Sequence, residues 1–364
     1  MKLYEIQEDD KLEELKEDKN IKAYDSVNSF LENYEKDNDN NNEDKNEIKE
    51  KNYIKELRNS CYKIIPNSTK FNEMAVKYFD KRYADLINEY KTKSEYKDFK
   101  TYSLKSFIFK SNDYLRQELL SLQLIKKFKL IFESAGIHLK LFPYEILITS
   151  KDSGLMEFLP NTISVDQLKK KYPEKDLNLF FREIFEENFY IAQKNFCESL
   201  AAYSLVCYFL EIRDRHNGNI LIDINGNLVH IDFGFILGIG PGGKTFEQAP
   251  FKLTEEYVEI LDGIDSDIFE YFKSMLFVGF VEIRKHFETL WQIIEITYRG
   301  NNDLPCFKDR NIDDIKKFFM SKFKFDELEL NLHGLIDPLI KQSYGNAKTS
   351  QYDLFQSITN GISS

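Results

Sequence analysis

The segment that most restricts the possible folds of this chain is DRHNGNILIDINGNLVHIDFG, residues 214–234. Two short apolar runs flank the pair Asn225-Gly226. Asn-Gly favours a two-residue type I′ turn, because both turn residues take positive φ. The segment therefore predicts a β-hairpin. Asp214 and His216 come just before it and Asp232 closes it, which favours a functional site over a plain core hairpin.

A two-residue turn also sets the register of the hairpin. It places Asn219 directly opposite Asp232, with Cβ atoms roughly 4.5–5.5 Å apart. An amide oxygen beside a carboxylate suits Mg²⁺, which takes one or two carboxylates together with phosphate oxygens. The alternative is that Asp232 only caps a turn and Asn219 only ends a strand. The sequence predicts a metal site at this pair, for Mg²⁺ or alternatively Mn²⁺.

The same residues have the layout of kinase chemistry, in which a catalytic-loop Asn and the Asp of an Asp-Phe-Gly motif hold the metals. Asp-Phe-Gly alone is a weak signal, but a loop with Asp, His and Asn begins eighteen residues before it. Protein kinases read His-Arg-Asp with the Asn five residues later. This chain reads Asp214-Arg215-His216, with Asn219 three residues after the His.

The reversed order resembles the phosphatidylinositol kinases and their large protein-kinase relatives. DRHNGNI and HIDFGFILG are similar to the type III phosphatidylinositol 4-kinases, most closely the beta form. The similarity runs from about residue 95 to the C-terminus, and residues 1–50 show none. The other stretches that carry it are DYLRQELL (113–120), PYEILITSKDSGLMEFL (143–159), SLAAYSLVCYFLEIRDRHNGN (199–219), PFKLTEEYVE (250–259) and YDLFQSITNGI (352–362).

The pattern along the chain predicts an α+β protein with two lobes, because a strand-rich part precedes a helix-rich part. A strand is expected at 101–110, and two more, joined at Pro143, within 138–150. An expected helix at 115–136 ends at Gly136. The resemblance makes this a bilobal protein-kinase-like fold, with a strand-rich N-lobe and a mainly helical C-lobe. The predicted divisions are an acidic, Asn-rich, largely disordered tail (1–52), the N-lobe with preceding helices (53–157), and the C-lobe with the catalytic and activation loops (158–364).

The resemblance also implies an ATP site. Lys110 corresponds to the family's ATP-phosphate lysine, and Glu118 would pair with it or organise metal and phosphate. Tyr144 corresponds to a pocket tyrosine, although a tyrosine beside a proline could equally belong to the core. Glu157 and Leu159 match the hinge between the lobes, where backbone groups would bind adenine.

No glycine occurs before Gly136, so the N-lobe cannot contain a glycine-rich phosphate loop. A glycine-free loop within KTKSEYK (91–97) is expected instead, with Ser94 as the best candidate for phosphate contact. The resembled family also uses a loop unlike that of protein kinases, so the departure does not oppose the assignment.

The implied reaction moves the γ-phosphate of ATP to the 4-hydroxyl of phosphatidylinositol. Either Asp214 or His216 accepts or orients the hydroxyl proton, and Arg215 between them is grouped with the catalytic residues. The activation segment FILGIGPGGKTFEQAP (235–250) has one cation, Lys244. One lysine suits a single phosphodiester, whereas several phosphates need several cations. The alternative is that this is only a flexible glycine loop.

Two other functions stay open at this stage. A class III-like phosphatidylinositol 3-kinase shares the Asp-Arg-His and Asp-Phe-Gly motifs, and a pseudokinase scaffold would bind without catalysis. A lipid substrate implies peripheral association with a membrane, of the Golgi type by resemblance, and a membrane-recruiting adaptor protein. The final helix, with Leu354, Phe355 and Ile358 on one side, is a candidate for docking, although it could equally pack in the core.

The distribution of charge and the lengths of the apolar runs restrict the binding partners and the cellular location of the chain. Residues 1–50 hold 8 of the 50 Lys and Arg and 17 of the 61 Asp and Glu, so −9 of the net charge of −11 is theirs. The nearly neutral remainder argues against strong non-specific binding of nucleic acid. The longest apolar run, about 199–210, is shorter than the roughly 20 residues that span a bilayer. With no signal-peptide pattern, a cytoplasmic soluble protein is expected.

Overall fold

A computed structural model describes residues 69–79, 82–241, 249–327 and 332–363 of the chain. All of them fall within one compact unit, Ile64–Ser364. The predicted tail at 1–52 and the predicted substrate-loop residue Lys244 lie outside the described residues.

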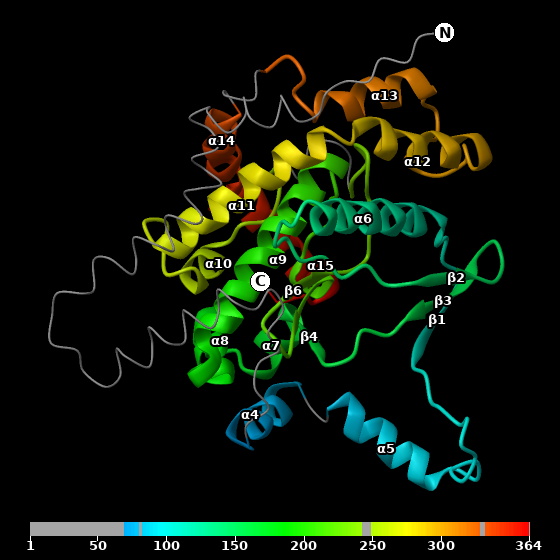
Figure 1. Cartoon of the computed structure of the whole chain (residues 1–364), viewed down its shortest axis with the longest axis vertical. Coiled ribbons are helices and arrows are strands. Elements are labelled where there is room, and N and C mark those ends of the chain that lie inside the picture. The colour runs from blue at the N-terminus through cyan, green and yellow to red at the C-terminus, as the bar shows by residue number, and fades with distance from the viewer. Residues whose placement is uncertain (1–68, 80–81, 242–248, 328–331, 364) are drawn as a thin grey trace, which may run out of the picture. The chain divides into compact units, whose positions relative to one another are not determined.

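The first sheet is antiparallel, with strand order β1-β3-β2 (Figure 1). It consists of β1 (Phe107–Ser111), β2 (Ile146–Ile148) and β3 (Ser153–Glu157). Two helices precede it, α4 (Thr69–Phe79) and α5 (Tyr83–Lys93), and α6 (Arg116–Ser134) follows β1. The helix predicted at 115–136 is thereby confirmed, and it ends next to Gly136, whose φ of 67° is left-handed.

The predicted strands form only in part, and the one expected before Pro143 is absent from the described sheet. Only Ile146–Ile148 of the stretch 138–150 joins the sheet, and β1 occupies only the end of the predicted strand. The reason lies in where the backbone hydrogen bonds go. The N–H of Lys140 donates to the carbonyl of Glu198 (3.4 Å), and that of Phe142 to the Tyr203 hydroxyl (3.1 Å). Both N–H groups thus bond to residues of a C-lobe helix, so this stretch does not need to pair with another strand.

The second part of the unit is mainly helical and is built around α9 (Phe189–Leu210), in which nearly every residue is buried. Helix α11 (Asp267–Arg284) packs along it. The α+β class and the bilobal kinase-like arrangement are confirmed. The other helices are α7 (Val165–Lys171), α8 (Leu177–Phe185), α10 (Glu255–Ile260), α12 (Phe287–Gly300), α13 (Ile312–Ser321), α14 (His333–Ser343) and α15 (Ala347–Asn360), with 3₁₀ turns η1 (Glu186–Asn188) and η2 (Asn217–Asn219).

A second antiparallel sheet of order β4-β5-β6 contains the predicted hairpin. Its strands are β4 (Thr162–Ser164), β5 (Ile220–Asp223) and β6 (Leu228–His230). The hairpin is confirmed, but its predicted register is wrong by one residue: Ile220 pairs with His230, so Asn219 lies opposite Ile231 instead of Asp232.

The side chain of Asp223 explains the shifted register. Its Oδ1 accepts the N–H groups of Asn225 and Asn227, each at 2.8 Å. This closes a three-residue loop in which only Gly226 has positive φ (81°), so a type I′ turn does not form. A Cβ on Gly226 would come within 2.7 Å of Ala192, so glycine also allows the loop to pack against α9.

Among the described residues, no helix combines the length and the apolar character that crossing a bilayer requires.

Candidate active site

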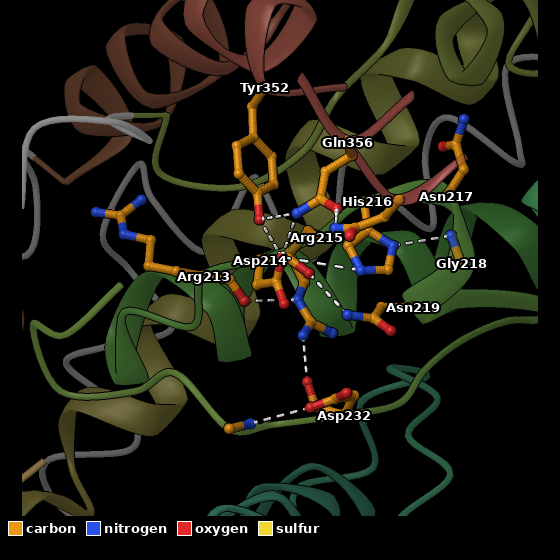
Figure 2. A network of polar contacts seen from close by, with 12 residues as sticks. Arg213, Asp214, Arg215, His216, Asn217, Gly218, Asn219, Asp232, Tyr352 and Gln356 are labelled. Carbon is orange, nitrogen blue, oxygen red and sulfur yellow. Dashed lines mark hydrogen bonds and ion pairs between the residues drawn. The ribbon is translucent and has the colours of Figure 1, made fainter. Parts of the chain in front are cut away.

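The loop 214–219 joins α9 to β5 and is closed by its own polar groups (Figure 2). Asp214 has a left-handed backbone, with φ of 66°. The Asn219 side-chain amide donates to the carbonyl oxygen of Asp214 (3.0 Å). The N–H of Gly218 donates to Nδ1 of His216 (3.1 Å). These bonds bring Asp214, His216 and Asn219 into one turn, as the sequence predicted for a catalytic loop.

The carboxylate of Asp214 is approached from the C-terminal helix. The Tyr352 hydroxyl donates to its Oδ1, and Nε2 of Gln356 lies 3.3 Å from the same oxygen (Figure 2). Nε2 of His216 is 3.8 Å away. Burial raises the pKa of Asp214, the tyrosine hydrogen bond lowers it, and the nearby charge of Asp232 raises it further.

The imidazole of His216 is neutral at pH 7. Burial lowers its pKa to about 4, and the positive charges of Arg215 and Lys252 act in the same direction. Because Nδ1 accepts a backbone N–H, the proton of the neutral ring lies on Nε2, the atom that faces Asp214. The ring can therefore donate a hydrogen bond on the carboxylate side of the loop.

Arg215 points away from the Asp214 carboxylate. Its guanidinium is buried and donates to the carbonyl oxygens of Arg213 (3.0 Å), Ile231 (2.8 Å) and Asp232. It also lies over the ring of Phe233, with 5.4 Å between the guanidinium carbon and the ring centroid. Arg215 therefore holds the Asp-Phe-Gly backbone in place.

Tyr144 holds the same backbone from the other side. The N–H of Asp232 donates to its hydroxyl (3.1 Å), which in turn donates to Oε1 of Glu118. The Tyr144 and Phe233 rings stack with centroids 6.2 Å apart. Asp232 has a left-handed φ of 59° and is exposed. The arrangement fixes the backbone of Asp232 and presents its carboxylate to the surface.

Two further residues contact this motif, and the sequence reading missed them. Nε2 of Gln117 donates to the carbonyl of Gly234, and its Oε1 accepts the N–H of Cys306 (2.8 Å). The hydroxyl of Ser121 lies 3.3 Å from the carbonyl of Phe233. Both are polar residues one turn apart on the buried face of α6. Buried polar residues at helical spacing were the only available signal.

The other predicted ATP-site residues are placed as follows. Lys110 is in β1, and its Nζ lies 3.8 Å from Asp113 instead of forming an ion pair with Glu118. Oε2 of Glu157 accepts the N–H of Glu145 (3.0 Å) at the end of β3. The carbonyl of Leu159 accepts the Thr162 hydroxyl (2.9 Å).

The loop expected within 91–97 begins at Ser94, where α5 ends. Helix α5 continues to Lys93 and ends at Ser94, so this stretch is partly helical and does not join two strands. The Ser94 hydroxyl accepts the N–H of Tyr96 (3.1 Å). The amphipathic pattern of α5 continues the helix further into 91–97 than the polar residues of that stretch suggested. These contacts do not bring Ser94 to the other site residues.

The chemistry of Asn219 and Asp232 fits a divalent cation. The side-chain nitrogen of Asn219 donates to the carbonyl oxygen of Asp214, so the amide oxygen of Asn219 points away from that bond. Asp232 adds an exposed carboxylate. Among the residues that the structure describes, no group of three or more His, Cys, Asp or Glu could hold a metal ion. Two oxygen ligands would be completed by phosphate oxygens, which is how Mg²⁺ binds in nucleotide sites.

Replacing Glu118 by Gln should stabilise the protein at high pH. Burial raises the pKa of Glu118 from 4.5 to about 6, with the Tyr144 hydrogen bond opposing that shift and the charge of Asp232 adding to it. An acid with a raised pKa in the folded state costs stability as pH rises from 4.5 through 6. We expect Glu118→Gln to raise the free energy of unfolding by about 2 kcal/mol more at pH 8 than at pH 4.5.

Denaturant unfolding at the two pH values measures this difference. Glu174→Gln, which alters an exposed carboxyl, controls for the loss of one charge. An effect of Glu118→Gln that is equal at both pH values would contradict the burial cost.

Comparison with known proteins places this site in a family context. Residues 105–305 match the family model described as phosphatidylinositol 3- and 4-kinase. The chain is 44% identical over 279 residues to phosphatidylinositol 4-kinase beta 2 of Arabidopsis thaliana, covering 74% of this chain and 24% of that protein. It is 41% identical over 273 residues to phosphatidylinositol 4-kinase beta of Xenopus laevis, covering 74% and 33%. The chain thus spans between a quarter and a third of the length of these relatives.

Proposed function

Because the chain belongs to the phosphatidylinositol 3- and 4-kinase family, we propose that it is a lipid kinase that transfers the γ-phosphate of ATP to the 4-hydroxyl of phosphatidylinositol. One observation carries the proposal: Asp214, His216 and Asn219 share one turn, and the backbone of Asp232 is held beside it by Arg215. The choice of the 4-hydroxyl follows the printed names of the relatives, which are 4-kinases.

In the proposed reaction, Asp214 accepts the proton of the attacking hydroxyl. His216 is less suited to that role, because its Nδ1 is occupied by the Gly218 N–H and its Nε2 carries a proton. The neutral ring, whose Nε2 lies 3.8 Å from the carboxylate, would instead donate a hydrogen bond to an oxygen of the transferring phosphate. Asn219 and Asp232 would hold Mg²⁺, which neutralises charge on the β- and γ-phosphates when bound. Positioning supplies most of the remaining rate.

The N-lobe residues would bind the nucleotide. Lys110 is a half-exposed cation at the start of the loop that leads to α6, and its charge lowers the pKa of Glu118, which burial raises. The lysine can thus approach both Glu118 and an ATP phosphate. Backbone groups between Glu157 and Leu159 would bind adenine, and Ser94 remains the candidate for a phosphate contact.

The lipid would be reached from a membrane surface, and α15 is suited to peripheral docking. Its apolar residues Leu354, Phe355 and Ile358 are 56%, 46% and 75% exposed, while Tyr352 and Gln356 on its other side are buried. The expected alternative, core packing of this helix, holds for the side that carries Tyr352 and Gln356, whereas the three apolar residues on the other side are exposed. We propose Golgi-type membranes as the location, with recruitment by an adaptor protein and with Lys244 as a head-group contact.

Removing this apolar side should weaken membrane binding. We expect the double substitution Leu354→Ala and Ile358→Ala to lower the partition onto phosphatidylinositol vesicles by roughly 10-fold or more, since each side chain contributes about 1.5–3 kcal/mol when fully buried. Co-sedimentation measures the partition. Ile296→Ala, on α12, removes an apolar side chain that is 72% exposed and serves as the matched control. An equal loss in the control would assign the effect to general hydrophobicity.

The experiment that tests the proposed function is a lipid phosphorylation assay with regiochemical analysis of the product. The purified chain is incubated with ATP, Mg²⁺ and vesicles that contain phosphatidylinositol or its bisphosphorylated form. We expect the 4-phosphate from phosphatidylinositol and little product from the bisphosphorylated lipid. A 3-phosphate product would identify a 3-kinase, and ATP binding without any turnover would identify a pseudokinase.

A further inference from the structure

Tyr352 is the residue of the C-terminal helix that lies closest to the proposed chemistry. Its side chain is only 1% exposed, and its hydroxyl donates to Oδ1 of Asp214, 138 residues away in the sequence (Figure 2). A buried tyrosine usually has a partner for its hydroxyl. Here the partner is the carboxylate that accepts the substrate proton in the proposed reaction.

The direction of this hydrogen bond is set by a chain of amides along α15. Nδ2 of Asn360 donates to Oε1 of Gln356 (2.5 Å), so the Gln356 amide has its nitrogen on the other side. That nitrogen donates to the Tyr352 hydroxyl oxygen (2.5 Å) and lies 3.3 Å from Asp214 Oδ1. Because the tyrosine oxygen already accepts a hydrogen bond, its one proton is directed at Asp214.

The catalytic loop alone orients this carboxylate less well. Nε2 of His216 is 3.8 Å from Oδ1, which is beyond hydrogen-bond distance, whereas both donors of α15 are within it. Asp214 also has a left-handed backbone, so its side chain leaves the loop in a direction that few residues adopt. Both donors of α15 bind Oδ1, and so they fix the position of that oxygen.

We propose that Tyr352 is a positioning residue that orients Asp214 for the transfer of phosphate, with Gln356 fixing the direction of the tyrosine O–H. The inference rests on the proposed function, since it assigns the role of Asp214 from it. Polar contacts at the chain end hold α15 in place for this task. The N–H of Ser363 donates to Asp166 (2.6 Å), and its carbonyl accepts the Asn217 amide (2.8 Å).

Tyr352→Phe tests the inference, because it removes one oxygen and keeps the ring. We expect kcat to fall roughly 10- to 100-fold, below the full 10²–10⁴-fold contribution of a general base, because the carboxylate itself remains. The KM for ATP should stay within about twofold, since the Tyr352 hydroxyl binds Asp214, which is not among the residues proposed to bind the nucleotide. Thr349→Val is the matched control: it removes a buried hydroxyl one turn away on the same helix, for which the described part of the chain offers no hydrogen-bond partner.

A double-variant cycle shows whether Tyr352 acts through Asp214. In the Asp214→Asn background, Tyr352→Phe should cause little further loss, because the group that it positions is already gone. Losses that multiply in the double variant would overturn the inference, as would a kcat of Tyr352→Phe within twofold of the wild type, or an equal loss in Thr349→Val.

The proposed function and this inference can fail separately. Wild-type protein that makes no phosphorylated phosphatidylinositol contradicts the function alone. The ratio of variant to wild-type rates is then measured on ATP hydrolysis without lipid, where water is the acceptor, and the same 10- to 100-fold loss is expected. A wild type without either activity overturns both.

Discussion

Asp232→Asn should abolish ATP turnover while the protein stays folded. The backbone of Asp232 is held by Tyr144 and Arg215 through its N–H and carbonyl, and neither bond uses the carboxylate. The amide can also adopt the left-handed backbone that Asp232 has, since Asn is tolerated there. What the substitution removes is one charged oxygen ligand of the proposed metal. Loss of about 4 kcal/mol of charge stabilisation corresponds to roughly a 10³-fold fall in kcat.

The control for this variant is Asp309→Asn. Asp309 is also exposed and has a left-handed backbone, with φ of 58°, in the loop before α13. ATP hydrolysis, lipid phosphorylation and thermal unfolding are measured for both variants. The wild type and the control should also bind ATP more tightly when Mg²⁺ or Mn²⁺ is added, and Asp232→Asn should lose that gain. Turnover above a tenth of the wild-type rate would remove Asp232 from the metal site.

The position of Asp232 also shows what the sequence could not predict. The hairpin was predictable from two apolar runs around Asn225-Gly226, but the register required knowing that the Asp223 carboxylate binds two N–H groups of the turn. That local competition moved every strand partner by one residue. Asp232 still lies at the proposed site, because its left-handed backbone interrupts the alternation of side chains along the strand. Residue propensities do not predict such a backbone.

Helices were predicted better than strands for a physical reason. The apolar spacing of α6 is a local property, and its bounds agree with the prediction within two residues. Residues 138–145 have the same apolar character as a strand, but their backbone bonds to Glu198 and Tyr203 on α9, about 60 residues later. A single sequence does not show such a distant competitor for backbone hydrogen bonds.

The residues of the proposed site likewise include some that the sequence predicted and some that it did not. Motif spacing identified Asp214, His216 and Asn219, because they are close in the sequence and share one turn. Tyr352 and Gln117 were missed, because each reaches the site from another helix more than 100 residues away in the chain. The residues proposed to carry the chemistry were predictable from the sequence, whereas identifying those proposed to orient them required the fold.

The orientation of α15 depends on a buried ion pair, and breaking it should be costly. The Lys252 ammonium lies 2.8 and 2.9 Å from the two carboxylate oxygens of Asp353 on α15, and its side chain is 1% exposed. It also donates to Oδ1 of Asn217 in the catalytic loop (3.1 Å). We expect Lys252→Met to lower the free energy of unfolding by about 3 kcal/mol, because it leaves a largely buried carboxylate without its partner.

The double substitution Lys252→Met and Asp353→Leu should restore most of that loss, because two apolar side chains of similar volume can replace a buried ion pair with little cost. The exposed pair Arg299–Glu295 on α12 is the matched control, and Arg299→Met there should cost far less stability, because exposed ion pairs contribute little. Denaturant unfolding measures these variants together with Asp353→Leu alone. If the two losses at Lys252 and Asp353 simply add, then the pair does not hold α15 to the catalytic loop. If stability returns in the double variant while kcat stays low, the bond from Lys252 to Asn217 has its own part in orienting the loop.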